Sequence, residues 1–248
     1  MKTKQHRMKN LFLFLFLLVV FTSKAQDNRV SGLNSRQFTK YWKVESESPD
    51  YKVTFQGDTA EIVSPKGLTL WRKEKMSGKV TIEYDACVVV ESDGDRLSDL
   101  NCFWMASDPQ YPDNLWKREK WRSGIFLNCY SLQLYYLGYG GNHNSTTRFR
   151  RYDGDESGIT NPKARPAILK EYTDAGHLLK PNHWYHIKIT NENNRVSYYI
   201  DGERLVDFRD AEPLREGWFG FRTTLSRTRI TNFSYECSSQ EATAVPLQ

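Results

Sequence analysis

Residues 184–208 read WYHIKITNENNRVSYYIDGERLVDF, and this stretch decides the fold class. Apolar and polar side chains alternate through residues 184–190, and they alternate again through residues 195–200. A period of two is typical of β-strands that bury one face. Asp201-Gly202 separates residues 195–200 from the returning segment 203–208, and both residue types tolerate the positive φ angles of a tight hairpin turn. The stretch therefore predicts antiparallel strands joined by short turns.

The same pattern continues outward along the chain. In residues 80–90, alternation would place Val80, Ile82, Tyr84, Ala86, Val88 and Val90 on one face. Further strands are predicted at residues 51–55, 61–64, 68–73, 101–106, 124–127, 132–139, 147–152, 203–208, 217–222 and 228–236. Residues 107–123 and 153–166 are expected to be polar loops. Many short strands without helical crossovers predict an all-β, antiparallel two-sheet jelly-roll sandwich.

Two blocks of sequence carry a resemblance to a known group. HWYHIKITNENNRVSYYIDGERLVDFRD (183–210) and EPLREGWFGFRTTLSRTRITNFSYE (212–236) resemble the C-terminal half of a concanavalin A-like jelly roll. DLNCFWMASDP (99–109), GIFLNCY (124–130) and YGGNHNSTTRFRRYDG (139–154) are similar to the YesU-like group of polysaccharide-utilisation proteins. The resemblance spans residues 36–237 and implies a carbohydrate partner, but its superfamily holds lectins, hydrolases and lyases, so it does not settle the reaction.

The N-terminal residues form the three parts of a secretory signal. Residues 1–9 are basic, and residues 11–21 are an unbroken apolar run. Ser23 and Ala25 then place small residues at the −3 and −1 positions of a cleavage site. Eleven apolar residues fall short of the roughly 20 that span a bilayer, although a short membrane anchor is the alternative. We expect a signal peptide at 1–25, a single jelly-roll domain at 26–237 and a flexible tail at 238–248. The mature protein would be secreted or periplasmic, free of the membrane and monomeric.

The net charge of +5 belongs to the expected signal. The 248-residue chain has 35 Lys and Arg against 30 Asp and Glu, and its first 25 residues carry five basic side chains and no acidic one. The remainder is balanced at 30 of each sign, which argues against a nucleic-acid partner.

The cysteines and the acidic loop leave alternatives open. Export would permit disulfides, and Cys87, Cys102, Cys129 and Cys237 allow three pairings, but buried free thiols are equally consistent with their apolar surroundings. We predict no metal or cofactor in the site. Asp93, Asp95 and Asp99 are close enough in sequence for a structural Ca²⁺, with a solvated loop as the simpler alternative.

The strongest signal of a binding face lies in residues 148–152. On a strand, Arg148, Arg150 and Tyr152 would point one way, because successive side chains alternate. Guanidinium groups match carboxylates and sulfates in bidentate geometry, so this face suits an acidic glycan. The alternative is a solvated outer face held by salt bridges. Aromatic side chains cluster just before it, and we predict that Trp104 and Tyr139 contact the sugar.

The leading hypothesis is a lyase that cleaves a uronate-containing glycan by β-elimination. This reaction needs a group that neutralises the carboxylate, a base for the C5 proton and an acid for the leaving oxygen. We assign the first task to Arg148 and Arg150 with Gln133 or Asn128, the base to His143, and the acid to Tyr152 or Tyr135. The paired motifs of alginate lyases are absent from the sequence, and Gln133-Leu-Tyr135 is only a loose match.

Two other functions stay open. One is a non-catalytic carbohydrate-binding jelly roll. The other is a glycoside hydrolase, which usually needs two carboxylates across the scissile bond. Laminarinase-like jelly rolls carry Glu-x-Asp-x-x-Glu on one strand, and here Glu83 and Asp85 are followed by Val88 in place of the second Glu. A pair from separate strands, such as Asp99 with Glu171, is the remaining route to hydrolysis.

Overall fold

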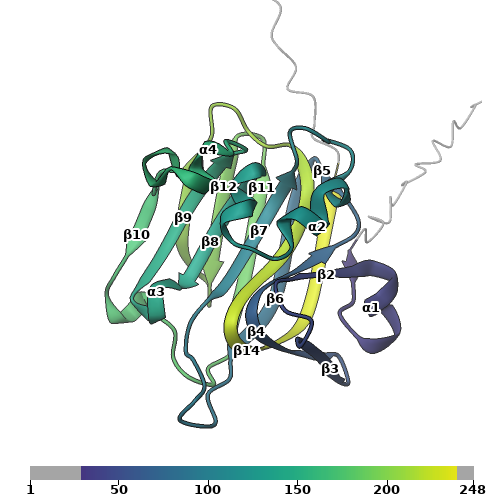
Figure 1. Ribbon diagram of the computed structural model, residues 1–248, viewed down its shortest axis with the longest axis vertical. Coiled ribbons are helices and arrows are strands. Elements are labelled where there is room, and N and C mark those ends of the chain that lie inside the picture. The colour runs from purple at the N-terminus through teal and green to yellow at the C-terminus, as the bar shows by residue number, and fades with distance from the viewer. Residues whose placement is uncertain (1–28, 239–248) are drawn as a thin grey trace, which may run out of the picture.

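A computed structural model of the chain describes residues 29–238. The expected signal at 1–25 and residues 239–248 of the expected tail lie outside the described residues. The described chain forms two facing antiparallel sheets, with short helices covering part of one of them (Figure 1). This architecture confirms the predicted all-β, two-sheet sandwich.

The first sheet carries the helices on its outer face. In spatial order it contains β10 (Lys170–Tyr172), β9 (Thr146–Asp153), β8 (Gln133–Gly140), β7 (Leu100–Ser107), the first half of β14 (Glu216–Ser238), the second half of β4 (Thr59–Arg72) and β2 (Trp42–Ser46). Every neighbouring pair is antiparallel.

The second sheet uses the other halves of the two long strands. Its order is β13 (Glu203–Arg209), β12 (Arg195–Ile200), β11 (Tyr185–Glu192), β6 (Lys79–Val88), the second half of β14, the first half of β4 and β3 (Lys52–Gln56). Two short strands, β1 (Val30–Ser31) and β5 (Met76–Ser77), also pair with β14.

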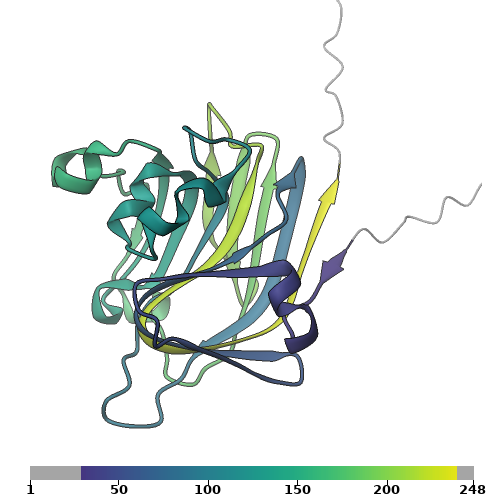
Figure 2. The ribbon, with the colours of Figure 1, turned by 45° about the vertical axis from the view of Figure 1, so that its right-hand side comes forward.

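Strand β14 passes from one sheet into the other at a bulge. Its pairing register with β4 shifts between Thr224 and Ser226, and Leu225 between them has a φ of 49°. A bulged residue bends a strand and increases its local twist, which turns both long strands through the edge of the sandwich (Figure 2).

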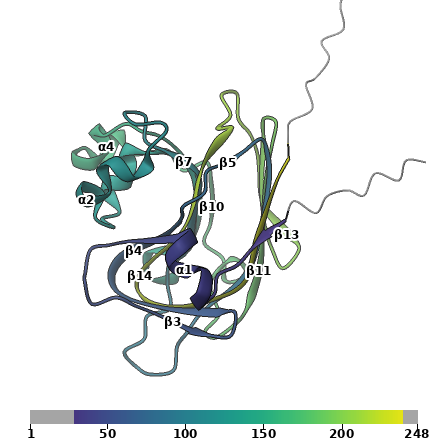
Figure 3. The ribbon, with the colours of Figure 1, turned by 90° about the vertical axis from the view of Figure 1, so that its right-hand side faces the viewer.

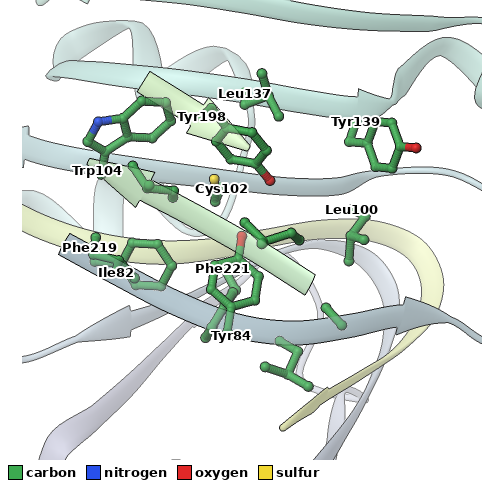
Figure 4. Close-up of a cluster of buried hydrophobic side chains, with 14 of the residues drawn as sticks. Ile82, Tyr84, Leu100, Cys102, Trp104, Leu137, Tyr139, Tyr198, Phe219 and Phe221 are labelled. Atoms are coloured by element: carbon green, nitrogen blue, oxygen red, sulfur yellow. The ribbon is translucent and has the colours of Figure 1, made fainter. Parts of the chain in front are cut away.

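The core between the sheets follows the predicted alternation. Val80, Ile82, Tyr84, Ala86 and Val88 of β6 are each at most 2% exposed. Figure 4 shows side chains from both sheets meeting in this layer, including Trp104, Tyr139, Tyr198 and Phe221. Burial of such side chains is the main favourable contribution to folding.

A cap lies on the outer face of the first sheet and forms a third layer (Figure 3). It consists of η1 (Leu115–Arg118), α2 (Glu119–Arg122), η2 (Leu127–Ser131), α4 (Ser157–Thr160) and η3 (Pro162–Ala164). A second apolar cluster, which includes Trp71, Phe103 and Tyr152, fills the space beneath it. The two segments predicted as polar loops therefore contain short helices with a buried side.

Most predicted strands are present within one or two residues, and the exceptions have physical causes. The strand predicted at residues 124–127 is wrong: Ser123 and Gly124 have φ angles of 50° and 70°, and Phe126 and Leu127 pack against the second apolar cluster. Strands β1, β2, β5 and β10 were not predicted, nor were the helical segments α1 (Ser35–Tyr41), α3 (Gly141–Asn144) and η4 (Ala175–His177). None of the helices within residues 29–238 has the length and apolar character needed to span a membrane.

Candidate functional site

A groove of about 620 Å³ runs across the outer face of the first sheet beside the cap. Strands β7, β8, β9 and β14 form its floor, residues 125–130 of the cap form one wall, and α3 with residues 96–99 borders the other side. Clefts of this size with a few convergent polar groups are typical of ligand sites.

Strand register builds the floor as a row of facing residues. Arg222 of β14 is opposite Asn101 of β7, Asn101 is opposite Gly138 of β8, and Gly138 is opposite Arg148 of β9. Directly paired residues on one face of a sheet have neighbouring side chains. Because Gly138 has no side chain, the row is hollow at its centre.

The phenol of Tyr136 occupies this hollow. A Cβ atom added to Gly138 would overlap the Oη of Tyr136, so the phenol lies over the glycine backbone. Tyr136 is also opposite Arg150 in the register of β8 and β9. The arrangement places one phenol between arginines from two different strands.

Burial keeps the Tyr136 phenol protonated. Loss of hydration raises the pKa of Tyr136 well above its ordinary value, and the nearby carboxylate of Asp99 raises that pKa further. Arg222 and Arg150 oppose the rise without reversing it. A phenol in this state can donate a proton or a hydrogen bond at neutral pH.

The arginines of the groove differ in how they are held. Arg148 Nε donates to Glu171 Oε1 at 2.5 Å, and Arg150 donates to the carbonyl of Pro166. The guanidinium of Arg165 stacks over the Tyr130 ring at 5.9 Å. The groove thus has ordered cations on its floor and on its cap side.

His143 lies at the rim of the groove in an unusual backbone conformation. Asn142, His143 and Asn144 all have left-handed φ angles, between 51° and 58°. The Asn144 side chain holds the segment, because its Nδ2 donates to the Leu179 carbonyl at 2.9 Å and its Oδ1 accepts from the Leu179 amide at 2.8 Å. Asn and His adopt left-handed φ angles more readily than most other residues apart from glycine.

A protein-family model matches residues 62–233, a segment that contains the floor strands and the cap. The family is described as a domain of unknown function, DUF6250. The chain belongs to the DUF6250 family. A search of curated protein sequences finds no match.

Solved structures share the fold of this DUF6250 protein. A Bacillus subtilis protein of unknown function with a galectin-like fold superposes with a TM-score of 0.66 and 16% identity, over 86% of this chain and 96% of its own. The carbohydrate-binding module CBM66 of B. subtilis gives 0.51 and 16%, over 79% and 94%. The exoplasmic/lumenal domain of VIP36, in a form with Ca²⁺ and Man3GlcNAc, gives 0.57 and 9%, over 88% and 91%.

The structure brings together three of the residues predicted for the site. His143, Arg148 and Arg150 all line the groove. Tyr152 projects from the same face of β9, but it is fully buried under the cap between Tyr130 and Tyr136. The cap, whose segments were predicted to be loops, separates this phenol from the groove.

Tyr135, Trp104 and Tyr139 lie on the opposite face of their strands. Trp104 and Tyr139 are buried in the core between the sheets, so the expected contact with a sugar is not available to them (Figure 4). Tyr135 is also in this core, and its Oη donates to Asp210 Oδ2 at 2.6 Å. Burial and this hydrogen bond raise the pKa of Tyr135, and neither brings the phenol to the groove.

The two amides predicted to bind substrate are also outside the lining of the groove. Gln133 begins β8 opposite Asp153, beyond the end of the groove. Asn128 lies in η2, where its Nδ2 donates to the carbonyl of Trp121 at 3.0 Å. Four residues that were not predicted for the site line the groove instead, namely Tyr136, Arg222, Asn101 and Arg165.

Most of the acidic side chains considered for calcium or for hydrolysis already bind other groups of the protein, and Asp93 is the exception within residues 29–238. Asp95 accepts from the backbone amides of Glu91 and Ser92, and Asp99 binds Arg96 Nη1 at 2.5 Å. Glu171 pairs with Arg148 from the neighbouring strand. Within residues 29–238, no three His, Cys, Asp or Glu side chains are grouped closely enough to hold a metal ion.

All four cysteines, which lie within the described part of the chain, are free thiols. Cys102 is in the core between the sheets, whereas Cys129 is in the cluster beneath the cap. Burial raises the pKa of both thiols to about 12, so they are protonated and unreactive at neutral pH.

Proposed function

We propose that this protein is a carbohydrate-active protein that binds an acidic glycan in the groove and cleaves it by β-elimination. The row of side chains from Arg222 through Asn101 and Gly138 to Arg148, with the Tyr136 phenol at its centre, is the observation that carries the proposal. It offers cations for uronate carboxylates and a protonated phenol between them.

The comparisons support a sugar partner in general terms. CBM66 is named as a carbohydrate-binding module, and the VIP36 domain was solved with an oligosaccharide bound. The resemblance of residues 99–109, 124–130 and 139–154 to the YesU-like group adds polysaccharide utilisation as the proposed setting. Residues 1–25 support the further proposal that the protein is exported, to the periplasm or beyond. We propose that it acts there as a monomer.

The proposed reaction assigns one task to each group. Arginines neutralise the uronate carboxylate, which makes the C5 proton more acidic. His143 accepts that proton, the C4–O bond breaks as the C4–C5 double bond forms, and the phenol of Tyr136 protonates the leaving oxygen. Tyr136 replaces the acids expected from the sequence, because Tyr152 and Tyr135 are buried away from the groove.

A panel of oligouronates tests this proposal through the ultraviolet absorbance of the unsaturated product. We expect Tyr136→Phe, His143→Ala and Arg150→Ala each to lower the rate by about 10²- to 10⁴-fold. Tyr152→Phe is the matched control: its buried Oη has no hydrogen-bond partner within residues 29–238, so its removal should leave the rate unchanged and should not lower stability. Unchanged activity in Tyr136→Phe together with lost activity in Tyr152→Phe would refute the assignment.

Non-catalytic binding is the second candidate, and two observations favour it. Arg148 and Arg150 are already held by Glu171 and Pro166, and His143 has no hydrogen-bonding or ionic partner within residues 29–238 to orient its ring. Measurable glycan binding without an unsaturated product from any member of the panel would select this function over the lyase. Hydrolysis has less support, because the two carboxylates of the groove, Glu47 and Asp99, both accept hydrogen bonds from the protein.

A further inference from the structure

Arg222 is a buried cation that is only partly satisfied by the protein. It is 3% exposed, and its Nη1 donates to the carbonyl of Gly124 at 2.5 Å and to Thr69 Oγ1 at 3.3 Å. Its Nε and Nη2 make no hydrogen bond within the described part of the chain, and none of the ion pairs found there includes Arg222. Buried charges are normally paired, so an unpaired one in the lining of a groove indicates an anion from outside.

Two carboxylates lie near Arg222, but neither forms an ion pair with it. Glu47 Oε2 and Arg222 Nη2 both lie beside Gly67, and the Gly67 amide donates to Glu47 Oε2 at 2.7 Å. The buried carboxylate of Glu45 is held by Arg122, whose Nη2 lies 2.9 Å from Glu45 Oε2. The ring of Phe126 packs against the guanidinium at 5.6 Å and covers one of its sides. The unpaired Nε and Nη2 together form the edge of a guanidinium that fits two oxygens of a carboxylate.

Asn101, the cross-strand neighbour of Arg222, also has an unused polar atom. Its Nδ2 donates to Asp99 Oδ1 at 3.2 Å, which identifies the other amide atom as the acceptor Oδ1. That Oδ1 is buried and has no hydrogen-bond partner within residues 29–238. A buried acceptor without a donor is costly, and a hydroxyl group of a ligand would satisfy it.

We propose that Arg222 and Asn101 form a subsite for one uronate residue, with the carboxylate on the Nε–Nη2 edge and a sugar hydroxyl on Asn101 Oδ1. This inference rests on the proposed function and adds to it the residues that distinguish an acidic sugar from a neutral one. Arg148 and Arg150, at the other side of the floor, keep the task given to them in the proposed reaction.

Calorimetric binding to matched ligands tests the subsite. The probes are trimers of galacturonate, glucuronate and mannuronate, each compared with its carboxyl-reduced neutral trimer and with a sulfated neutral trimer. We expect the wild type to prefer an acidic trimer, and Arg222→Gln to weaken that binding by about 10- to 100-fold while binding of the neutral trimer changes little. Arg222→Lys should lose most of the preference too, because an ammonium group has no bidentate edge.

Thr69→Val is the matched control, since it removes one anchor of Nη1 and leaves the unpaired edge of Arg222 intact. Thermal unfolding of each variant shows whether the cap and sandwich are still folded. If Arg222→Gln is folded and keeps the preference for the acidic trimer, or if only binding of the sulfated trimer falls, the uronate subsite is refuted and the proposed function stands. If no acidic trimer binds the wild type, the proposed function is refuted as well.

Discussion

Tyr135 and Tyr136 are adjacent in the chain and serve different layers of the molecule. Tyr135 points into the core between the sheets, where its hydroxyl donates a hydrogen bond to Asp210. Tyr136 points into the groove beside Arg150. The only difference between them is their place in the two-residue period of β8. A one-residue change of register would exchange their roles.

Gly138→Ala tests whether the hollow in the floor positions the phenol. The added methyl group would overlap the Oη of Tyr136, and the ring must then move out of its place over the sheet. We expect the rate of the proposed β-elimination to fall by about tenfold or more, since small displacements of a reacting group are costly, with a loss of stability of about 1–3 kcal/mol. Steady-state kinetics and urea unfolding check the two effects separately. A rate equal to that of the wild type would exclude a positioned phenol.

At the scale of elements, the turn after α2 brings the cap against strand β2. Gly124 has a φ of 70°, and a Cβ atom at this position would lie 2.7 Å from the Cα of Ser46 and 2.8 Å from the Glu45 carbonyl oxygen. These are backbone atoms of β2, and they cannot move aside in the way that the end of a flexible side chain can. The glycine is therefore required both by conformation and by the close approach.

Gly124→Ala should cost about 2–4 kcal/mol, as the sum of left-handed strain and overpacking. Gly57→Ala is the matched control, because Gly57 also has a left-handed φ, 59°, but a Cβ there has nothing within 4 Å. We expect the control to lose about 1–2 kcal/mol, from strain alone. If urea unfolding shows the same loss of stability in both variants, the close contact with β2 adds nothing to the cost of Gly124→Ala.

The two long strands β4 and β14 are also joined by an ionic network on the second sheet. Glu61 Oε1 lies 2.9 Å from Arg227 Nε, and Glu61 Oε2 lies 2.7 Å from Arg229 Nε. The hydrogen bond from Arg227, opposed by partial burial and assisted by Arg229, holds the pKa of Glu61 below its ordinary value. Because the folded-state pKa is lowered, its contribution to stability is present above the unfolded pKa and is lost as pH falls through the folded pKa.

Glu61→Gln should therefore be less stable than the wild type at neutral pH, by about 1 kcal/mol, and the difference should shrink as the pH falls below about 4. Urea unfolding at several pH values measures this dependence. Glu192→Gln removes a single pair with Lys79 in which both side chains are about half exposed, so it should have almost no effect. A Glu61→Gln difference that does not change with pH would contradict the assigned ionic role.

At the scale of the whole molecule, the cap and the sandwich together make the groove. Arg122 of the cap is fully buried, and its Nη2 donates to Glu45 Oε2 of β2 at 2.9 Å and to the Leu115 carbonyl at 2.7 Å. Desolvation raises the pKa of Glu45 even though Arg122 opposes the shift, so the joint is a desolvated ion pair. Such a pair is strongly disrupted when one partner is removed.

Arg122→Met should lower the free energy of unfolding by about 3–5 kcal/mol, because it leaves the buried Glu45 carboxylate without its ion-pair partner and, among the described residues, with only the Gly124 amide as a hydrogen-bond donor. In the Arg122→Met variant, amides of the cap (residues 115–131) should exchange faster than in the wild type. Amides in β6 and β11 should change less. Lys43→Met removes the more exposed ion pair to Glu119 at the same joint and should cost less than about 1 kcal/mol. Cap amides that stay as protected as in the wild type would show that the cap does not depend on this pair.

Charge is distributed unevenly over the whole molecule. Outside residues 1–25 the chain is balanced at 30 basic and 30 acidic side chains, yet the groove is lined by five arginines and two carboxylates. A cleft lined mainly by one sign of charge raises the local concentration of opposite charges. A neutral chain can therefore present a site suited to an acidic ligand.

Sequence alternation predicted the strands well because most of them bury one face and expose the other, as in β11 and β3. It could not predict the faces of β7 and β8, because the core covers one side of these strands and the cap covers the other. Trp104 and Tyr139 were selected for this reason, although they lie in the core. The apolar side of the cap itself was hidden among charged residues, as Leu115 shows.

The sequence by itself determined the all-β class, the hairpin at Asp201-Gly202 and the common face of Arg148 and Arg150, because these depend on neighbours in the chain. Only the tertiary structure decided that Arg222, Asn101 and Tyr136 meet them in one groove. These residues come from three strands, and their meeting depends on strand order and register, with the cap closing one side. Register is set by contacts between strands distant in sequence, and strands buried on both faces carry no alternation from which it can be read.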